Sequence, residues 1–311
     1  DLFAPAAGPV ELSASVTPMS SQTYTVQWEI DGFVLGSSSV VDGKTTFLGT
    51  SLPSGNKQID ARLVTDAGAC PIGSSVNLKL CKSDLTESFN TALNTALWTT
   101  VGDAFWDASG WIEMTDAVGD RKGQIYNSFE YIESGDVSIR FSVATGGGSN
   151  PGADGFAMTI LQTDEVSEFE GWVSQAEGGG GLGYGIGGNY GSFDGDAFTV
   201  EIDTWYNQIN GVEKHTDPTQ EDHISITLDG DPGNPIATFE VPEIEDLTWH
   251  DIRVDISANT LVVFFDGVQK VEQNIADLFF RGGYLWFSGS TGFYSNYHRF
   301  DNLRILNNCK P

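Results

Sequence analysis

The chain has 311 residues, and its 43 acidic residues outnumber its 15 basic residues, which gives a formal net charge of −28. This excess of acid repels phosphate backbones and anionic lipid surfaces, so it argues against nucleic acid or a membrane surface as the partner. Hydrophobic residues make up 40% of the chain and aromatic residues 12%, which predicts a globular protein. No apolar run is long enough to insert across a bilayer.

Residues 1–81 contain short alternating segments separated by turn residues, which is typical of a small immunoglobulin-like (Ig-like) β-sandwich. Turns are predicted at Asp31-Gly32, Asp42-Gly43 and Ser54-Gly55. Trp28 is predicted to fill the core of this domain, and we expect the domain to be a structural spacer. The predicted strands cover 10–16, 23–30, 44–49, 57–65 and 75–80.

The composition shifts near residue 82, and one long β pattern then continues to Leu306. Alternation such as that of Ile252, Val254 and Ile256 gives each strand one buried face. Since helical periodicity is almost absent, the chain is predicted to be all-β, with residues 82–311 forming a single large two-sheet sandwich. The predicted strands cover 123–129, 136–143, 155–162, 197–205, 223–228, 250–257, 260–267, 282–290 and 297–306.

The three cysteines, Cys70, Cys81 and Cys309, do not have the spacing of a zinc site. They allow one disulfide, and we favour Cys81–Cys309 because the first and last strands of β-sandwiches often lie side by side. Cys70–Cys81 is the alternative pair. A disulfide would place the protein outside a reducing cytosol.

Residues 200–207 read VEIDTWYN and begin as a strand that carries two carboxylates. Residues two apart share a face of a strand, so Glu201, Asp203, Trp205 and Asn207 are predicted to line up. Two carboxylates and a carboxamide on one face repel one another unless a cation lies among them. The alternative interpretation is that these are solvated strand and loop residues.

A hard cation such as Ca²⁺ suits this set, because it takes about six to eight oxygen ligands. Asp203, Asn207 and a backbone carbonyl near Trp205 are candidate ligands, and a further carboxylate would come from Asp217 or Asp222. A nitrogen donor, His223, would suit a second and softer divalent ion beside Glu201 and a shared Asp203.

The Glu201 and Asp203 pair also resembles the nucleophile half of the jelly-roll glycoside hydrolases, whose motif is E-x-D-x-x-E or E-x-D-x-E. Retaining hydrolysis needs a second carboxylic acid about 5–5.5 Å away. The positions that should supply this acid hold Trp205 and Tyr206. We therefore predict that the protein is not an enzyme, with a β-sandwich glycosidase as the less favoured alternative.

Four segments, in the same order along the chain, resemble motifs of the legume-type (L-type) lectins. Each is weak alone, but together they give a specific match over about residues 82–308. The segments are Ala153–Ala157 (the A-D-G-[IF]-A-F sugar-binding motif), Gly178–Gly183 (the glycine-rich G-G-x-L-G loop), Val200–Asn207 with Asp217-Pro218 and His223–Ile226 (the metal-binding signature), and Trp286–Gly292 (the G-F-S-A-S-T-G strand end).

The resemblance implies a jelly-roll β-sandwich that binds carbohydrate in a calcium-dependent way and without turnover. With the Ig-like segment in front, this organisation resembles that of secreted or cell-surface bacterial adhesins. Carried over by position, the calcium ligands would be Asp203, Asn207, Asp217 and the Trp205 carbonyl, and the ligands of a second, Mn²⁺-like ion would be Glu201, Asp203, Asp217 and His223.

The resemblance also implies a sugar site, in which Asp154, Asn207 and a backbone N–H of Gly180 or Gly181 hold the sugar hydroxyls. Phe293 and Tyr294 are candidates for stacking on the sugar. The peptide bond between Ala153 and Asp154 is expected to be cis, as it is in the family.

One spacing departs from the plant proteins, where the aspartate of Asp-Pro lies five residues before the histidine. Here Asp217 lies six residues before His223, and Asp222 adjoins the histidine, so Asp222 is an alternative ligand. A lectin fold used to bind protein or peptide in an assembly is the alternative function.

Overall fold

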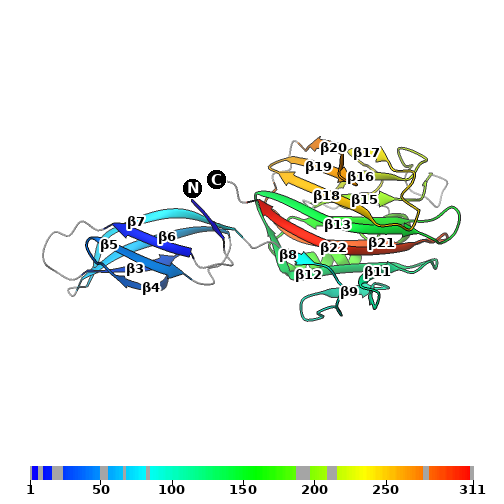
Figure 1. The fold of residues 1–311 in the computed structure, drawn as a ribbon. Coiled ribbons are helices and arrows are strands. Elements are labelled where there is room, and N and C mark those ends of the chain that lie inside the picture. The colour runs from blue at the N-terminus through cyan, green and yellow to red at the C-terminus, as the bar shows by residue number, and fades with distance from the viewer. Residues whose placement is uncertain are drawn as a thin grey trace. The chain divides into compact units, whose positions relative to one another are not determined.

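The computed structural model describes residues 2–5, 10–15, 24–49, 55–65, 68–81, 85–186, 197–208, 216–275 and 280–308. Two compact units make up the chain: unit 1 consists of Asp1–Asp84 and Asn307–Pro311, and unit 2 of Leu85–Leu306. Both units are built almost entirely from strands, so the predicted all-β class is confirmed (Figure 1).

Unit 1 contains a five-stranded sheet, in the order β1-β7-β6-β3-β4, and a β2-β5 pair. Trp28 is buried as predicted, and its indole N–H donates a 2.7 Å hydrogen bond to the Ser38 hydroxyl. Strand β4 was not predicted, because its residues are largely exposed and do not alternate. The Ig-like assignment of this unit stays a prediction. The strands are β1 Leu2–Pro5, β2 Val10–Ser15, β3 Thr25–Ile30, β4 Phe33–Ser39, β5 Lys44–Gly49, β6 Gly55–Thr65 and β7 Gly68–Cys81.

The preferred disulfide, Cys81–Cys309, cannot be followed in the structure. Cys309 and the side chains of Cys70 and Cys81 lie outside the described residues. Both pairings therefore stay predictions. Among the helices that the structure describes, none is both long enough and apolar enough to cross a membrane.

Unit 2 is a sandwich of two large sheets. The eight-stranded sheet has the order β10-β11-β22-β13-β18-β19-β20, with β8 beside β22, and the seven-stranded sheet has the order β17-β16-β15-β14-β21-β12-β9 (Figure 1). The strands are β8 Leu85–Glu87, β9 Thr99–Gly102, β10 Phe105–Asp107, β11 Trp111–Thr115, β12 Lys122–Glu133, β13 Asp136–Gly146, β14 Gly155–Leu161, β15 Ala197–Asp203, β16 His223–Leu228, β17 Ala237–Glu240, β18 His250–Ser257, β19 Thr260–Phe265, β20 Val268–Asn274, β21 Gly282–Ser290 and β22 Tyr297–Asn308.

The main core of unit 2 lies between the two sheets. Strand β18 follows the predicted alternation closely, with Ile252, Val254 and Ile256 buried and the residues between them more exposed. From the opposite sheet, Val200 and Ile202 on β15 point into the same core. Because side chains alternate along a strand, Glu201 and Asp203 point away from this core, to the outer face of the seven-stranded sheet.

A second apolar layer covers that outer face. It consists of helix α1 (Val166–Gln175) and the chain that follows it, and we call residues 166–186 the covering layer. Phe169, Trp172 and Tyr184 of this layer pack into one cluster with residues of the sheet. The Gln124 side chain of β12 donates 2.9 Å hydrogen bonds to the carbonyls of Val173 and Gly183, which fastens the layer to the sheet.

The helix is a correction to the sequence analysis, which expected almost no helical periodicity. Helix α1 has ten residues, and only Phe169, Trp172 and Val173 among them are buried. Three apolar positions in so short a segment give only a weak helical pattern in the sequence. A helix of this length is stabilised mainly by its packing on the sheet.

Candidate functional site

The candidate site begins where β15 ends, at the edge of the covered face. Glu201 lies opposite Ser225 in the β15–β16 pair, and Asp203 lies opposite His223. On its other side, Asp203 lies opposite Gly155 of β14. Although they are on the outer face of the sheet, Glu201 is only 1% exposed and Asp203 5% exposed.

Glu201 is buried beneath Tyr184, whose hydroxyl donates a hydrogen bond to the Glu201 carboxylate. The same hydroxyl lies 2.9 Å from the Thr227 hydroxyl. The pKa of Glu201 is raised to about 8. Burial is the main cause, the hydrogen bond from Tyr184 opposes it, and the charges of Asp217 and Asp231 add to it. Pattern analysis missed this contact, because no sequence periodicity links the glycine-rich segment to β15.

Asp203 accepts a 2.9 Å hydrogen bond from the Trp205 backbone N–H. Burial raises the pKa of Asp203 well above its usual value, and the nearby charges of Asp217, Glu201 and Asp154 raise it further. The other three carboxyl groups are therefore close enough to repel that of Asp203. Neither Glu201 nor Asp203 forms an ion pair with a lysine or arginine of the described residues.

Asn207 and Asp217 are joined by two hydrogen bonds. The Asn207 N–H donates to the Asp217 carboxylate, and the Asp217 N–H donates to the Asn207 carbonyl over 3.1 Å. Both residues are buried. The structure thus places Asp217 beside Asn207 and within the electrostatic reach of Asp203.

Asp222 belongs to different surroundings. The pKa of Asp222 is raised to about 7, mainly by burial and then by the charges of Glu245 and Glu221. Neither Asp203 nor Asp217 contributes to this shift. Of the two alternatives that the sequence left open, Asp217 is therefore the aspartate that lies with the Asp203 group.

His223 is also buried, and its Nδ1 lies 3.0 Å from the Glu221 carbonyl. Within the described ranges, no three His, Cys, Asp or Glu side chains are grouped so that they could hold one metal ion. The predicted second ion needs Glu201, Asp203, Asp217 and His223 together, and the structure does not assemble this set.

The predicted calcium site needs fewer charged side chains in one place, because Asp203 and Asp217 are its only carboxylates. Its other oxygens come from the Asn207 side chain and the Trp205 carbonyl. All these donors are oxygens, which matches the preference of Ca²⁺. Buried, mutually repelling carboxylates are also the groups that a cation would neutralise, so the residues present fit a calcium ion.

Asp154 lies next to this set, at the beginning of β14. The Ala153–Asp154 peptide is cis, as the resemblance implied. The Asp154 N–H donates to the Ser290 carbonyl over 3.0 Å, and its carbonyl accepts from the Thr204 N–H over 2.9 Å. A Cβ added to Gly292 would lie 3.0 Å from the Asp154 carboxylate, so this glycine leaves room beside the acid.

The glycine-rich segment forms a short 3₁₀ turn, η1 (Gly179–Gly181), that is tied to β21 by the Ser290 hydroxyl. The Gly181 N–H already donates to the Gly178 carbonyl over 3.2 Å. Of the two predicted glycines, Gly180 is therefore the better candidate to donate its N–H to a ligand.

Aromatic side chains border the site on the loop after β21. Tyr294 stacks on Trp205 with ring centroids 4.6 Å apart and planes inclined by 26°. Phe293 meets Tyr294 edge-on at 5.2 Å and is 91% exposed. The rings of Trp205, Tyr294 and Phe293 thus contact one another in sequence. Packing does not explain the position of Phe293, because its ring is almost fully exposed.

No family model and no curated protein matches the chain. Several solved structures do resemble it. The metal-free lectin I-B4 of Griffonia simplicifolia has a TM-score of 0.58 at 17% identity, over 73% of this chain and 99% of its own. The Bauhinia forficata lectin in complex with GalNAc has a TM-score of 0.57 at 18% identity, over 72% and 97%. The Ca²⁺/Man2-bound exoplasmic/lumenal domain of VIP36 has a TM-score of 0.54 at 16% identity, over 73% and 88%.

Matches over more than 70% of the chain must lie largely in unit 2, because unit 1 is much the smaller of the two. Unit 2 has the legume-lectin fold. The predicted jelly-roll sandwich is therefore confirmed at the level of fold, which is what a likeness at this identity shows. Of the three structures named, the Bauhinia forficata lectin is in complex with GalNAc and the VIP36 domain is bound to Man2.

Proposed function

We propose that the protein binds glycans through unit 2, in a calcium-dependent way and without chemical turnover. The observation that carries the proposal is the buried carboxyl of Asp203 at one edge of the covered sheet, on which the charges of Asp154 and Asp217 act. The lectin fold supports the proposal, since its relatives include proteins bound to GalNAc and to Ca²⁺ with Man2.

In this proposal Ca²⁺ is held by Asp203, Asp217, the Asn207 side chain and the Trp205 carbonyl. The ion supplies positive charge to buried carboxylates. The protein's own part is to hold Asn207 in place, through its hydrogen bonds with the carboxylate and the backbone N–H of Asp217. Holding Asn207 before the ligand arrives lowers the entropic cost of binding.

The sugar would lie against Asp154, the Asn207 amide and the Gly180 N–H. A sugar hydroxyl both donates and accepts, so an acidic acceptor beside amide donors can satisfy it fully. Glycine at position 180 lets the backbone approach the ligand closely. Phe293 and Tyr294 would cover an apolar face of the sugar.

The rest of the chain fits a protein that presents this module outside the cell. We propose residues 1–81 as an Ig-like spacer and residues 82–311 as the lectin domain of a secreted or cell-surface, adhesin-type protein. The Cys81–Cys309 disulfide belongs to this proposal, because it requires an oxidising compartment.

Glycan-array binding, measured with calcium and with EDTA, tests the proposal. We expect binding that EDTA abolishes and that Asp154→Ala and Asp154→Asn also abolish, while Asp222→Asn keeps it. Binding that survives both EDTA and Asp154→Ala would overturn the site. Release of reducing sugar that is lost in Glu201→Gln would show a hydrolase instead.

A further inference from the structure

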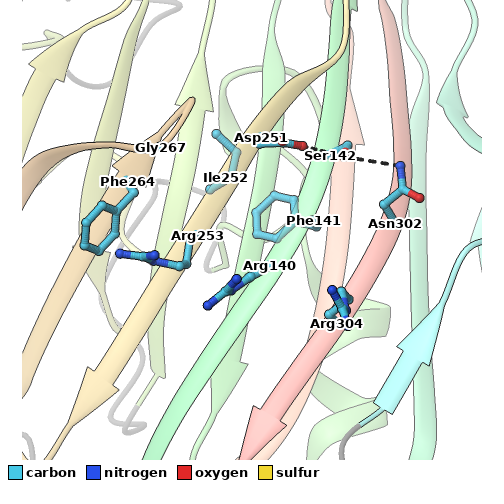
Figure 2. Close-up of a pocket in the computed structure, with 10 residues that line it drawn as sticks. All are labelled: Arg140, Phe141, Ser142, Asp251, Ile252, Arg253, Phe264, Gly267, Asn302 and Arg304. Carbon is cyan, nitrogen blue, oxygen red and sulfur yellow. Dashed lines mark hydrogen bonds between the residues drawn. The ribbon is translucent and has the colours of Figure 1, made fainter.

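A groove with an unusual charge crosses the outer face of the other sheet, the eight-stranded one. It has a volume of about 490 Å³ and lies across the neighbouring strands β22, β13, β18 and β19. Arg140, Arg253 and Arg304 line it, each from a different strand (Figure 2). Asp251 is the one acidic residue of its lining, in a chain where acids outnumber bases almost threefold.

The three arginines lie on neighbouring strands although their positive charges repel one another. Arg140 and Arg253 lie directly opposite each other in the β13–β18 pair. Like charges in opposite positions of an antiparallel pair destabilise the sheet. Arg304 adds a third positive charge on β22, the strand on the other side of β13.

Their neighbours neutralise little of this charge. The Arg253 Nε lies 3.3 Å from the Asp255 carboxylate, in a half-exposed ion pair. Of the acids in the described ranges, none lies within ion-pair distance of Arg140 or Arg304. Both of these side chains are exposed, so their guanidinium groups are available to a ligand.

Other groups in the groove suit a ligand that is more than a bare ion. The Arg253 guanidinium lies 3.4 Å above the Phe264 ring, a cation–π contact that fixes its plane. At the opposite side, the Asn302 amide donates to the Ser142 hydroxyl, which donates to Asp251. The groove therefore combines flat cations, an aromatic ring and a polar chain that can bond to hydroxyls (Figure 2).

The backbone of β22 contributes to this arrangement. Phe300 and Leu303 are both buried, so two residues separate them where regular alternation allows one. Asn302, between them, has a φ of 55°, a conformation that asparagine tolerates better than most residues. Such an irregularity re-aims a side chain, and here it turns both Asn302 and Arg304 to the outer face.

We propose that this groove is a second ligand site of unit 2, which binds a short saccharide carrying carboxylate or sulfate groups without calcium. Guanidinium groups bind such oxyanions through paired, charge-assisted hydrogen bonds. The charge of the whole chain disfavours a long polyanion. At physiological salt, screening acts over about 8 Å, so a short ligand responds mainly to the three arginines.

Calorimetric titration of the whole chain in EDTA tests this proposal. The probes are trigalacturonate for carboxylate, a sulfated heparin disaccharide for sulfate, neutral maltotriose, and sodium sulfate at equal ionic strength. We expect one of the two acidic saccharides to bind in the millimolar range or tighter, and neither maltotriose nor sodium sulfate to match it. Binding of trigalacturonate would show that carboxylate groups alone suffice. Binding of the heparin disaccharide without trigalacturonate would assign the recognition to sulfate, because both probes carry carboxylates.

Arg140→Gln and Arg304→Gln should each weaken this binding at least about tenfold, since each removes a charged donor. Arg281→Gln is the matched control, because it changes the net charge equally outside the groove and should leave the affinity unchanged. Exposed arginines tolerate these changes, and unchanged circular dichroism would show that the variants are folded.

Absence of binding by both acidic saccharides, or equal binding of sodium sulfate, overturns the proposal. So does an affinity that Arg140→Gln and Arg304→Gln leave unchanged. The outcome is independent of the calcium site, because Asp154→Ala should keep groove binding while the two groove variants keep calcium-dependent binding to neutral glycans.

Discussion

The two sheets of unit 2 differ in what lies on their outer faces. The seven-stranded sheet is covered by residues 166–186, so Glu201 and Asp203 are buried although they point away from the main core. The eight-stranded sheet has exposed charges on its outer face, and Arg140 and Arg304 lie in contact with water.

This difference decides how each face can tolerate like charges. Water screens the exposed arginines, which weakens their mutual repulsion. The buried carboxylates have no such screening, and burial accordingly raises the pKa values of Glu201 and Asp203. A covered acidic face therefore requires protons or a cation, whereas an open basic face is free to exchange small anions.

At neutral pH, the largest expected effect is that of calcium on the covered face. A ligand at one hundred times its Kd stabilises the folded state by about 2.7 kcal/mol, which for a unit of this size corresponds to about 5–10 °C in the melting temperature. Asp217→Asn should abolish the shift, and Asp222→Asn should retain it. Differential scanning fluorimetry with calcium and with EDTA measures this, and the opposite pattern would transfer the ligand role to Asp222.

A second test removes one hydroxyl from the covering layer. Tyr184→Phe deletes the donor to the buried Glu201 carboxylate, and an unsatisfied buried group costs about 1–3 kcal/mol. Chemical denaturation should show this loss without a change in the slope. Tyr206→Phe, on a half-buried tyrosine of the same region, is the control and should stay within about 0.5 kcal/mol. Equal losses in both variants would contradict a specific role for Tyr184.

The interior between the two sheets supplies a pH test. His298 is buried, its Nδ1 lies 2.7 Å from the Thr115 hydroxyl, and burial lowers the pKa of His298 to about 3 from its usual 6.5. Between these values the unfolded chain binds the proton and the folded protein does not. Stability from this group is complete above pH 6.5 and falls with pH toward 3, by about 1.4 kcal/mol per pH unit.

His298→Gln should remove the contribution of this one proton, about 1.4 kcal/mol per pH unit, from the slope of the unfolding free energy against pH. Measured as the pH dependence of the unfolding free energy, the variant and the parent should run parallel at pH 8 and diverge below pH 6.5. Identical slopes across the whole range would show that His298 does not resist protonation in the folded state.

The smallest expected effect concerns the edge of the covered face. Phe293→Ala should change stability by no more than about 0.5 kcal/mol, because the ring is 91% exposed. Loss of its stacking should weaken calcium-dependent glycan binding by roughly 2–10-fold. Phe129→Ala, which removes a similarly exposed ring at 71% exposure, should leave glycan affinity unchanged. If both variants bind equally well, Phe293 is no part of the sugar site.

Much of the fold was accessible from the sequence, because many strands are short runs rich in apolar and β-branched residues between turn residues. The predicted segments 223–228, 250–257 and 282–290 coincide with β16, β18 and β21. The edge strands β17 and β20 were missed. Most residues of β17 are half-buried and most residues of β20 are exposed, so neither strand shows an alternation between buried and exposed residues that marks one buried face. Helix α1 was missed because too few of its residues are buried to form a stripe.

By itself, the sequence determined the all-β class and brought Glu201, Asp203, Asn207 and Asp154 forward as candidates, because these depend on local alternation and motif order. Only the tertiary structure decided that the charge of Asp217 acts on Asp203, whereas Asp222 is subject to the charges of Glu245 and Glu221. It also decided that Tyr184 covers Glu201, and that three arginines distant in sequence share one groove. The physical reason is that burial and Coulomb repulsion depend on separation in space, which strand pairing sets and sequence spacing does not.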